Sequence, residues 1–182
     1  DLTKLSNSLV TVQTGTELIS AGSAGFDAGN FGFITSGSKT VFCGFRGVLA
    51  ARIDSLTLEI KESKEFDTYL NLTNADALDT WIKDRLNTND YLVFTIKDEG
   101  SRSLSAGLKS TLRGLGSVYI DSVKIREAWA FGIKLSSKPV KIFEGYSRRR
   151  LDKVYTEKLV PFQPGLIALK MPSGTTGQLK SL

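Results

Sequence analysis

The residues best suited to chemistry lie near the two ends of one stretch of the chain, 91–133. Asp98 and Glu99 follow one apolar run directly, and Arg126 precedes a second run that contains Trp129. A carboxylate and a guanidinium can together hold two neighbouring hydroxyls of a sugar or a backbone amide, and their pairing avoids an unpaired buried charge. We predict that Asp98 and Arg126 meet in a polar pocket that binds a ligand without catalysis, with Trp129 as its apolar wall.

A plainer interpretation of the same residues stays open. In it, Asp98 and Arg126 form a salt bridge that orders the turn, and Trp129 belongs to the core. Asp67 is a further carboxylate that could join Asp98 and Glu99 in a hydrolase pair or a hard-cation site. Carboxylate pairs are common in solvated turns, however, so we expect Asp67 at most to line the pocket, with no metal bound.

The chain contains no His and only one Cys, Cys43. Without His, a Ser–His–Asp triad, a Cys–His pair and an ordinary zinc site are all excluded within these residues. One Cys cannot form an intramolecular disulfide, and Cys43 is expected to be a small core residue. The sequence therefore favours a binding or structural protein over an enzyme, with no cofactor.

Composition and charge place the chain among ordinary globular proteins. It has 182 residues, of which 41% are hydrophobic and 24% charged, and no apolar run approaches the length of a membrane span. The net charge of +5 is uneven, since the segment 138–182 holds nine basic and three acidic residues. The positive excess therefore belongs to the end of the chain, and the remainder is close to neutral.

Arg148, Arg149, Arg150 and Lys153 form the densest basic cluster. Such a cluster can bind nucleic acid or anionic lipid, but aromatic residues that would stack on bases are not interleaved with it. We predict instead that these four residues dock on an acidic protein surface, with no nucleic acid or membrane partner.

Short apolar runs separated by turns predict an α+β domain with mixed strands and short helices. We divide the chain into an extended Ser/Gly-rich arm (1–39), a compact domain (40–146) and a basic tail (147–182), and a disordered leader is the alternative interpretation of 1–39. The arm carries two predicted strands, 9–12 and 31–34. Predicted helices are 75–86 and 103–112, and predicted strands in the domain are 40–43, 47–53, 56–61, 64–69, 91–96, 118–120, 123–125, 128–134 and 140–143.

Five separated motifs resemble the interleukin-like EMT inducer domain, also called the GG domain. They are FDTY at 66–69, the helix ADALDTWI, the strand YLVFTIKDEGS, the helix end LRGLGS and the strand IREAWAFGIK, and they cover roughly 47–136. The resemblance implies two twisted antiparallel sheets with two or three short flanking helices around a partly polar cavity. The chain departs from animal members by lacking their paired cysteines, and the usual RDSW appears as Arg126-Glu127-Ala128-Trp129.

The resemblance also sets the expected function. The family includes cytokine-like secreted proteins, the stem of a glycosyltransferase that acts on O-mannosyl glycans, hyaluronan-related surface proteins and bacteriophage long tail fibre proteins. The chain looks most like the last group. We therefore expect a structural virion protein for host attachment, assembled in the host cytoplasm, that serves as a hinge or connector between tail-fibre or baseplate subunits. The alternative is a carbohydrate-binding or cytokine-like secreted module.

Overall fold

Strands dominate the structure, and two short helices accompany them. The computed structural model describes residues 15–162, 169–170 and 176–177. The strands are β1 (Gly15–Gly25), β2 (Phe31–Ser36), β3 (Lys39–Phe42), β4 (Gly47–Ile53), β5 (Ile60–Phe66), β6 (Tyr91–Asp98), β7 (Trp129–Lys134), β8 (Val140–Tyr146), β9 (Lys153–Phe162), β10 (Leu169–Lys170) and β11 (Thr176–Gly177). The helices are α1 (Leu72–Lys83) and α2 (Ala106–Gly114), with a 3-10 turn, η2, at Phe26–Ala28.

Strands β1 to β9 form one mixed sheet in which β6 is the central strand. One side of the sheet runs β5-β4-β6-β7-β8, and the other runs β3-β2-β1-β9, with antiparallel neighbours in both. A short parallel pairing of β1 with β6 joins the two groups. The predicted β-rich domain with short helices is therefore confirmed, but the predicted pair of separate antiparallel sheets is not.

The junction of β1 with β6 consists of two residue pairs, Ala24 with Lys97 and Gly25 with Asp98. Two fully buried hydroxyls extend it. Ser23 Oγ donates to the Ile96 carbonyl at 2.5 Å, and Thr95 Oγ1 donates to the Gly22 carbonyl at 2.6 Å. These side chains satisfy buried carbonyls that would otherwise lack donors where the two strand groups meet.

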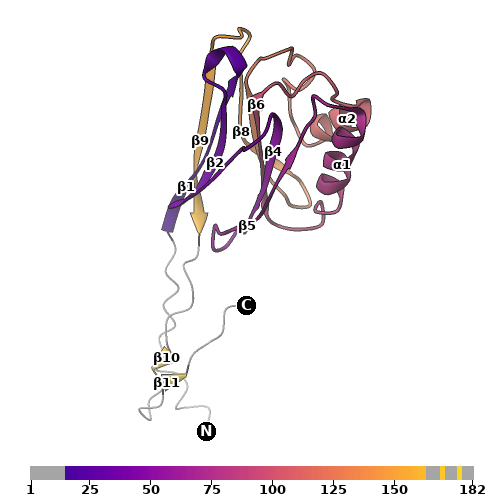
Figure 1. Cartoon of the computed structure of the whole chain (residues 1–182). Helices are drawn as coiled ribbons and strands as arrows, with labels where there is room; N and C mark the ends of the chain where they lie inside the picture. The colour runs from indigo at the N-terminus through magenta and orange to yellow at the C-terminus, as the bar shows by residue number, and fades with distance from the viewer. Residues whose placement is uncertain (1–14, 163–168, 171–175, 178–182) are drawn as a thin grey trace.

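Strand β6 is apolar along its length because both of its faces are buried. Leu92, Phe94 and Ile96 pack in a cluster with residues of α1 and α2, whereas Tyr91 and Val93 pack in a second cluster with residues of β1 and β2. Figure 1 shows α1 and α2 on one side of the β4–β6 region and β1, β2 and β9 on the other. The core therefore has two layers, one on each side of β6.

The segments predicted as an arm and a tail contribute strands to this sheet. β1 pairs with β9 over ten residue pairs, and their inward side chains, such as Ile19 and Val160, are buried with β4 and β6. The packing of the described residues therefore differs from the predicted division at 39/40 and 146/147. The strand predicted at 9–12 lies outside the described residues, as does most of the chain beyond Phe162.

Several local predictions need correction. The strand predicted at 56–61 is a turn up to Glu59, because the Asp54 carboxylate accepts the backbone N–H groups of Leu56 and Thr57 at 2.7 and 2.8 Å. Likewise, the predicted pieces at 118–120 and 123–125 are turns, and no strand is present between α2 and β7. In these segments, backbone N–H groups donate to side-chain carboxylates and not to a neighbouring strand. An apolar pattern that is typical of a strand is therefore not sufficient to form one.

Both helices begin at polar caps. Asn71 caps α1 by accepting from the Asn74 N–H at 3.1 Å, so the helix starts three residues earlier than predicted. Ser105 caps α2 by accepting from the Leu108 N–H at 3.3 Å. Among the described residues, neither helix is long and apolar enough to cross a membrane.

Substitution of Ile19 tests whether β1 is part of the folded unit. Ile19 has no exposed surface, so Ile19→Ala should lower the free energy of unfolding by about 2–5 kcal/mol, measured by urea denaturation. The control is Leu159→Ala on β9, where 63% of the side chain is exposed and the change should stay within about 0.5 kcal/mol. An Ile19→Ala protein as stable as the parent would contradict the packing of β1 in the core.

Candidate functional site

Asp98 and Arg126 lie where three backbone segments converge. Asp98 ends β6 and pairs with Gly25 at the end of β1, and Arg126 precedes β7. The Gly25 backbone lies so close to Arg126 that a Cβ atom at Gly25 would stand 1.9 Å from the Arg126 carbonyl oxygen. Both Asp98 and Arg126 have positive φ angles, 64° and 61°, which few residues other than Gly adopt. The backbone is therefore strained at the two positions that the sequence singled out.

Glu99, not Asp98, connects the two segments. Its carboxylate accepts from the Ser101 N–H at 2.6 Å, the Ser101 hydroxyl at 2.7 Å and the Arg102 N–H at 3.2 Å. It also accepts from the backbone N–H of Arg126. Glu99 is only 3% exposed, so four donors replace the water that its charge has lost. This buried carboxylate fixes both strained turns.

The side chains of Asp98 and Arg126 do not form the predicted pair. The Arg126 guanidinium contacts Asp27 of η2 at 3.3 Å and lies over the Phe26 ring at 4.9 Å. Within the described part of the chain, the Asp98 carboxylate makes no hydrogen bond or ion pair with a side chain or a backbone N–H. The sequence could not indicate Asp27, because it belongs to the segment predicted as an arm.

Trp129 is a core residue and not a wall of an open pocket. It is 1% exposed and stacks on Phe131 with 5.8 Å between ring centroids. Its backbone N–H donates to Ser23 Oγ at 3.0 Å, and its indole N–H donates to Glu144 Oε1 at 3.0 Å. The interpretation of Trp129 as a core residue therefore fits the structure, and its interpretation as the wall of a pocket does not.

Glu144 on β8 organises the loop that follows α2. Its carboxylate accepts from the Ser117 hydroxyl at 2.5 Å and from the backbone N–H groups of Val118 and Tyr119, in addition to the Trp129 indole. Burial disfavours its charged form, but these hydrogen bonds together outweigh burial and hold the pKa of Glu144 below its usual value. No sequence signal marks this residue.

Asp67 also serves as a local acceptor. It forms an ion pair with Arg46 at 3.1 Å and accepts from the backbone N–H groups of Tyr69 and Leu70 at 3.2 and 3.0 Å. The guanidinium groups of Arg46 and Arg102 lie 4.3 and 4.8 Å from the centroid of the Tyr69 ring. Asp67 therefore orders the turn after β5, and the structure does not join it to Asp98 by a hydrogen bond.

The predicted basic cluster occupies the turn between β8 and β9. Arg149 pairs with Asp152 at 2.8 Å, whereas Arg148 and Arg150 are exposed and make no ion pair with any described residue. Lys153 begins β9, and its ammonium group lies 5.7 Å from the centroid of the Phe31 ring. The basic cluster therefore leads directly into β9, and its last residue lies beside an aromatic residue of β2.

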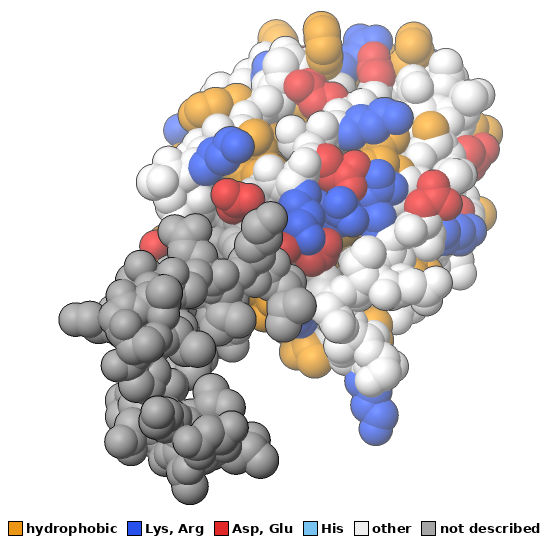
Figure 2. Space-filling view, turned by 90° about the horizontal axis from the view of Figure 1, so that it is seen from below, with side chains coloured by type: hydrophobic (Ala, Val, Ile, Leu, Met, Phe, Trp, Pro, Cys, Tyr) orange, Lys and Arg blue, Asp and Glu red, His pale blue; other side chains and the backbone are white. Residues whose placement is uncertain are grey.

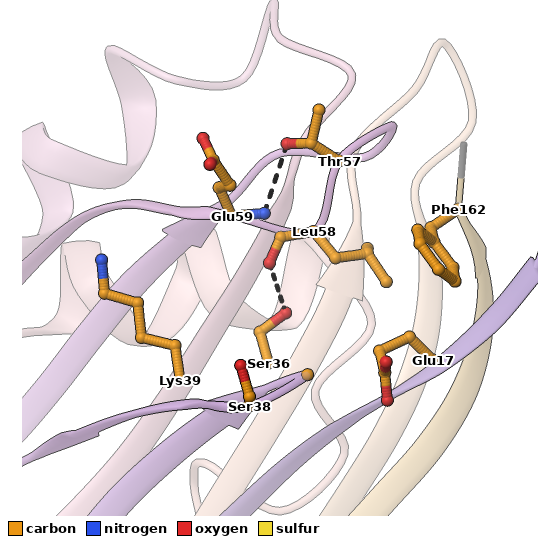
Figure 3. Close-up of a pocket in the computed structure, with 9 residues that line it drawn as sticks. Glu17, Ser36, Ser38, Lys39, Thr57, Leu58, Glu59 and Phe162 are labelled. Atoms are coloured by element: carbon orange, nitrogen blue, oxygen red, sulfur yellow. Dashed lines mark hydrogen bonds between the residues drawn. The ribbon is translucent and has the colours of Figure 1, made fainter. Parts of the chain in front are cut away.

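A pocket of about 320 Å³ lies near the other end of β1 and β9, at a place that the sequence did not indicate. Glu17, Lys39, Glu59 and Phe162 line it together with Leu58 (Figure 3). Leu58 has a positive φ of 59°, and its carbonyl accepts from the Ser36 hydroxyl at 2.7 Å. The pocket combines two carboxylates, one ammonium group and an aromatic ring.

Charged side chains form a network on the underside of the domain, where β4 ends and β5 begins. Glu62 lies 2.8 Å from Arg52 and 2.6 Å from Arg85, and Lys61 lies 2.5 Å from Asp54. Figure 2 shows acidic and basic side chains side by side on this face. Because opposite charges alternate, the network neutralises itself and presents no single-sign surface to a partner.

The part of the chain that the structure describes contains no cluster suited to a metal ion and no activated thiol. In the described ranges, His, Cys, Asp and Glu side chains nowhere cluster in threes as a metal ion would need. Burial and the neighbouring Glu65 raise the pKa of Cys43 to about 12, so the thiol stays protonated. Cys43 packs in the core between β3 and β4, as predicted.

Comparison with known proteins identifies the central part of the chain. The family model of the interleukin-like EMT inducer matches residues 46–134, from the start of β4 to the end of β7. This central part of the chain is therefore similar to the interleukin-like EMT inducer domain. The match includes Asp67, Asp98, Arg126 and Trp129 but not β1, β2, β3, β8 or β9. No curated protein matches the chain.

Loss of the Glu99 charge should be costly. Glu99→Gln keeps the side-chain volume but gives the buried donors of Ser101, Arg102 and Arg126 a weaker and partly mismatched partner, so we expect a loss of about 3 kcal/mol in unfolding free energy. The control is Asp98→Asn, since Asn tolerates a positive φ and the change should cost less than about 0.5 kcal/mol. Equal effects of the two changes would show that Glu99 is not the connecting residue.

The Asp54 turn should make stability depend on pH. Burial opposes ionisation of Asp54, but Lys61 and the N–H groups of Thr57 and Leu56 lower its pKa from 3.8 to about 2. A depressed folded-state pKa stabilises the protein above pH 4, and that contribution disappears as the pH falls towards 2. Urea denaturation at pH 6, 4 and 2.5 should show the parent losing its advantage over Asp54→Asn in this window. A constant difference would refute the assignment.

Proposed function

We propose that the chain is a non-catalytic structural module of a virion, a connector in a bacteriophage long tail fibre that docks other fibre or baseplate subunits. The observation that carries the proposal is the pairing of β1 with β9. Gly15 lies opposite Phe162, so the first and the last residue of these two paired strands lie together at one end of the domain (Figure 1). A domain attached at one end leaves its other faces available to partners.

The roles of the buried carboxylates support a non-catalytic protein. Glu99 and Glu144 accept most of their hydrogen bonds from backbone N–H groups and neighbouring hydroxyls, and Asp67 accepts from a guanidinium and two N–H groups. Each is occupied in holding a loop. A general acid or base needs instead a carboxylate that can exchange a proton with a substrate.

Exposed apolar side chains support a docking role. Phe42, Tyr155 and Leu159 all lie on the four-stranded group β3-β2-β1-β9 and are more than half exposed. Contiguous apolar surface on a folded domain marks interaction sites more often than chance would give. The exposed Arg148 and Arg150 beside β9 would favour an acidic partner surface.

Carbohydrate binding is the second candidate, and one observation favours it. Asp98 and Arg126 are both non-Gly residues with positive φ at a single junction, and strained backbone is often retained where it shapes a functional site. The test is a glycan array probed with the parent, Asp98→Asn and Arg126→Asn, since Asn accepts the same backbone conformation. A signal lost in both variants would establish the site, and a flat array would reject it.

The connector proposal predicts where the protein is found. Antibodies against the purified domain, used for immunogold electron microscopy of particles of the phage that encodes the chain, should label the tail fibres. In particles that carry Arg148→Glu/Arg150→Glu, fibre attachment should be reduced, while the exposed Lys138→Glu between β7 and β8 serves as a charge-reversal control. Labelling absent from the particle, or confined to the capsid, would overturn the proposal.

Charge reversal is preferable to truncation for this purpose. Deletion of the chain after Arg148 would remove β9 and its ten pairs with β1, so the domain would lose part of its core. Loss of assembly would then report unfolding and not a lost contact. Arg148 and Arg150 are exposed, and their replacement should leave the unfolding free energy within about 0.5 kcal/mol of the parent.

A further inference from the structure

Four aromatic rings form a row across the outer face of β9, β1, β2 and β3. Tyr155 and Phe33 are both register partners of Gly22, and Phe42 is the register partner of Phe33. The centroids of neighbouring rings lie 6.3 Å apart for Tyr155–Phe33 and for Phe33–Phe42, and Phe31 lies within 6.0 Å of Phe33. We call these four residues, Phe31, Phe33, Phe42 and Tyr155, the aromatic row.

Gly22 allows the rings to meet. Tyr155 and Phe33 stand on strands separated by β1, so their Cα atoms are roughly 9.5 Å apart, yet their rings approach to 6.3 Å. The rings must therefore lean over Gly22. A Cβ atom there would lie 2.2 Å from Phe33 Cε1, which leaves no room for any side chain. The close approach of the two rings therefore depends on a glycine at position 22.

The aromatic row is exposed although it is well ordered by its neighbours. Phe42 is 70% exposed and Tyr155 is 64% exposed, while Phe31 and Phe33 are half-buried. The opposite faces of the same strands pack in the core through Ile19, Ile34 and Val154. The outer face therefore needs no side chain of this size for folding. Large aromatic residues on a rigid surface are the kind that dominate the energy of protein interfaces.

A basic side chain, Lys153, lies at one end of the aromatic row, and two further basic residues precede it in the chain. The Lys153 ammonium group lies 5.7 Å from the Phe31 ring centroid, and the exposed Arg148 and Arg150 lie in the turn directly before β9. Glu157 is the acidic residue that β9 itself contributes. The sequence shows no aromatic residues interleaved with the basic cluster, but the fold brings Phe31 of β2 to Lys153.

From this geometry, and on the basis of the proposed function, we infer that the aromatic row is a docking surface for a protein segment that carries apolar side chains next to carboxylates. The rings would pack against the apolar side chains, and Lys153 with Arg148 and Arg150 would pair with the carboxylates. Charge complementarity selects this partner over a basic or neutral one. Stacking between rings and an apolar chain would provide most of the affinity, and the basic end would set the orientation.

Labelled synthetic peptides test the inference. One short peptide alternates Asp with Phe and Leu, a second replaces every Asp by Lys, and a third replaces Phe and Leu by Ser. Fluorescence anisotropy should show binding of the first peptide alone, weakening as salt is added because exposed charges are screened. Binding of the Lys peptide with equal affinity, or no binding of the acidic one, would overturn the inference.

Variants locate the binding. Phe42→Ser/Tyr155→Ser should weaken binding about tenfold or more, and Lys153→Glu should weaken it at low salt, because these changes remove anchors and not core. Gly22→Ala keeps every aromatic residue but should displace the Phe33 ring and weaken binding as well. The matched controls, Leu70→Ser and Val118→Ser, change comparably exposed apolar residues elsewhere and should bind as the parent does. Equal losses in controls and row variants would refute a specific surface.

If the aromatic row binds a different kind of partner, the experiments give a different result. NMR shifts at Tyr155 and Phe33 on addition of soluble oligosaccharides, without shifts from the acidic peptide, would assign the row to a glycan. A dimer in sedimentation that Phe42→Ser/Tyr155→Ser abolishes would assign it to a second copy, and either result overturns the inference. If the antibodies label tail fibres but the acidic peptide does not bind, the connector proposal stands and this inference alone fails.

Discussion

The junction of β1 with β6 is the constraint on which the rest of the structure depends. Only two residue pairs join the strands directly, and the hydroxyls of Ser23 and Thr95 supply the next hydrogen bonds. This short contact connects the four-stranded group to the five-stranded group. It also brings Gly25 against Arg126 and so requires the strained turns that Glu99 fixes. The core layer between the two strand groups and the position of the aromatic row on the outer face of the four-stranded group depend on this contact.

Sequence patterns predicted the middle of the chain well, because there local signals and tertiary packing agree. The apolar run of β6 matches a strand buried on both faces, and the spacing of Leu78, Trp81 and Ile82 matches the buried side of α1. The motifs around Asp98 and Arg126 led to the family that the comparison supports for residues 46–134. Periodicity and motif order are therefore sufficient where an element forms mainly by its own pattern.

The remaining features depend on contacts between distant residues, which periodicity does not encode. The small side chains of β1 are typical of a linker. β1 is nevertheless a strand, because Phe33 and Tyr155 cover Gly22 on one face and the other face packs in the core. The side-chain partners at the candidate site were missed for the same reason. Arg126 pairs with Asp27, 99 positions away, and the buried acceptor is Glu99, whose neighbour Asp98 has the same chemistry in the sequence. Which of two adjacent carboxylates turns inward is decided by backbone geometry at the junction.

The antiparallel pairing of Gly15 with Phe162 has a mechanical consequence. A force that pulls these two residues apart acts across the ladder of β1 and β9 and opens its hydrogen bonds one pair at a time, as a zipper opens. Strands loaded along their length would instead have to break many bonds at once. The domain is therefore mechanically weak under tension applied between Gly15 and Phe162. A force applied to the faces of the domain would instead be shared among many side-chain contacts.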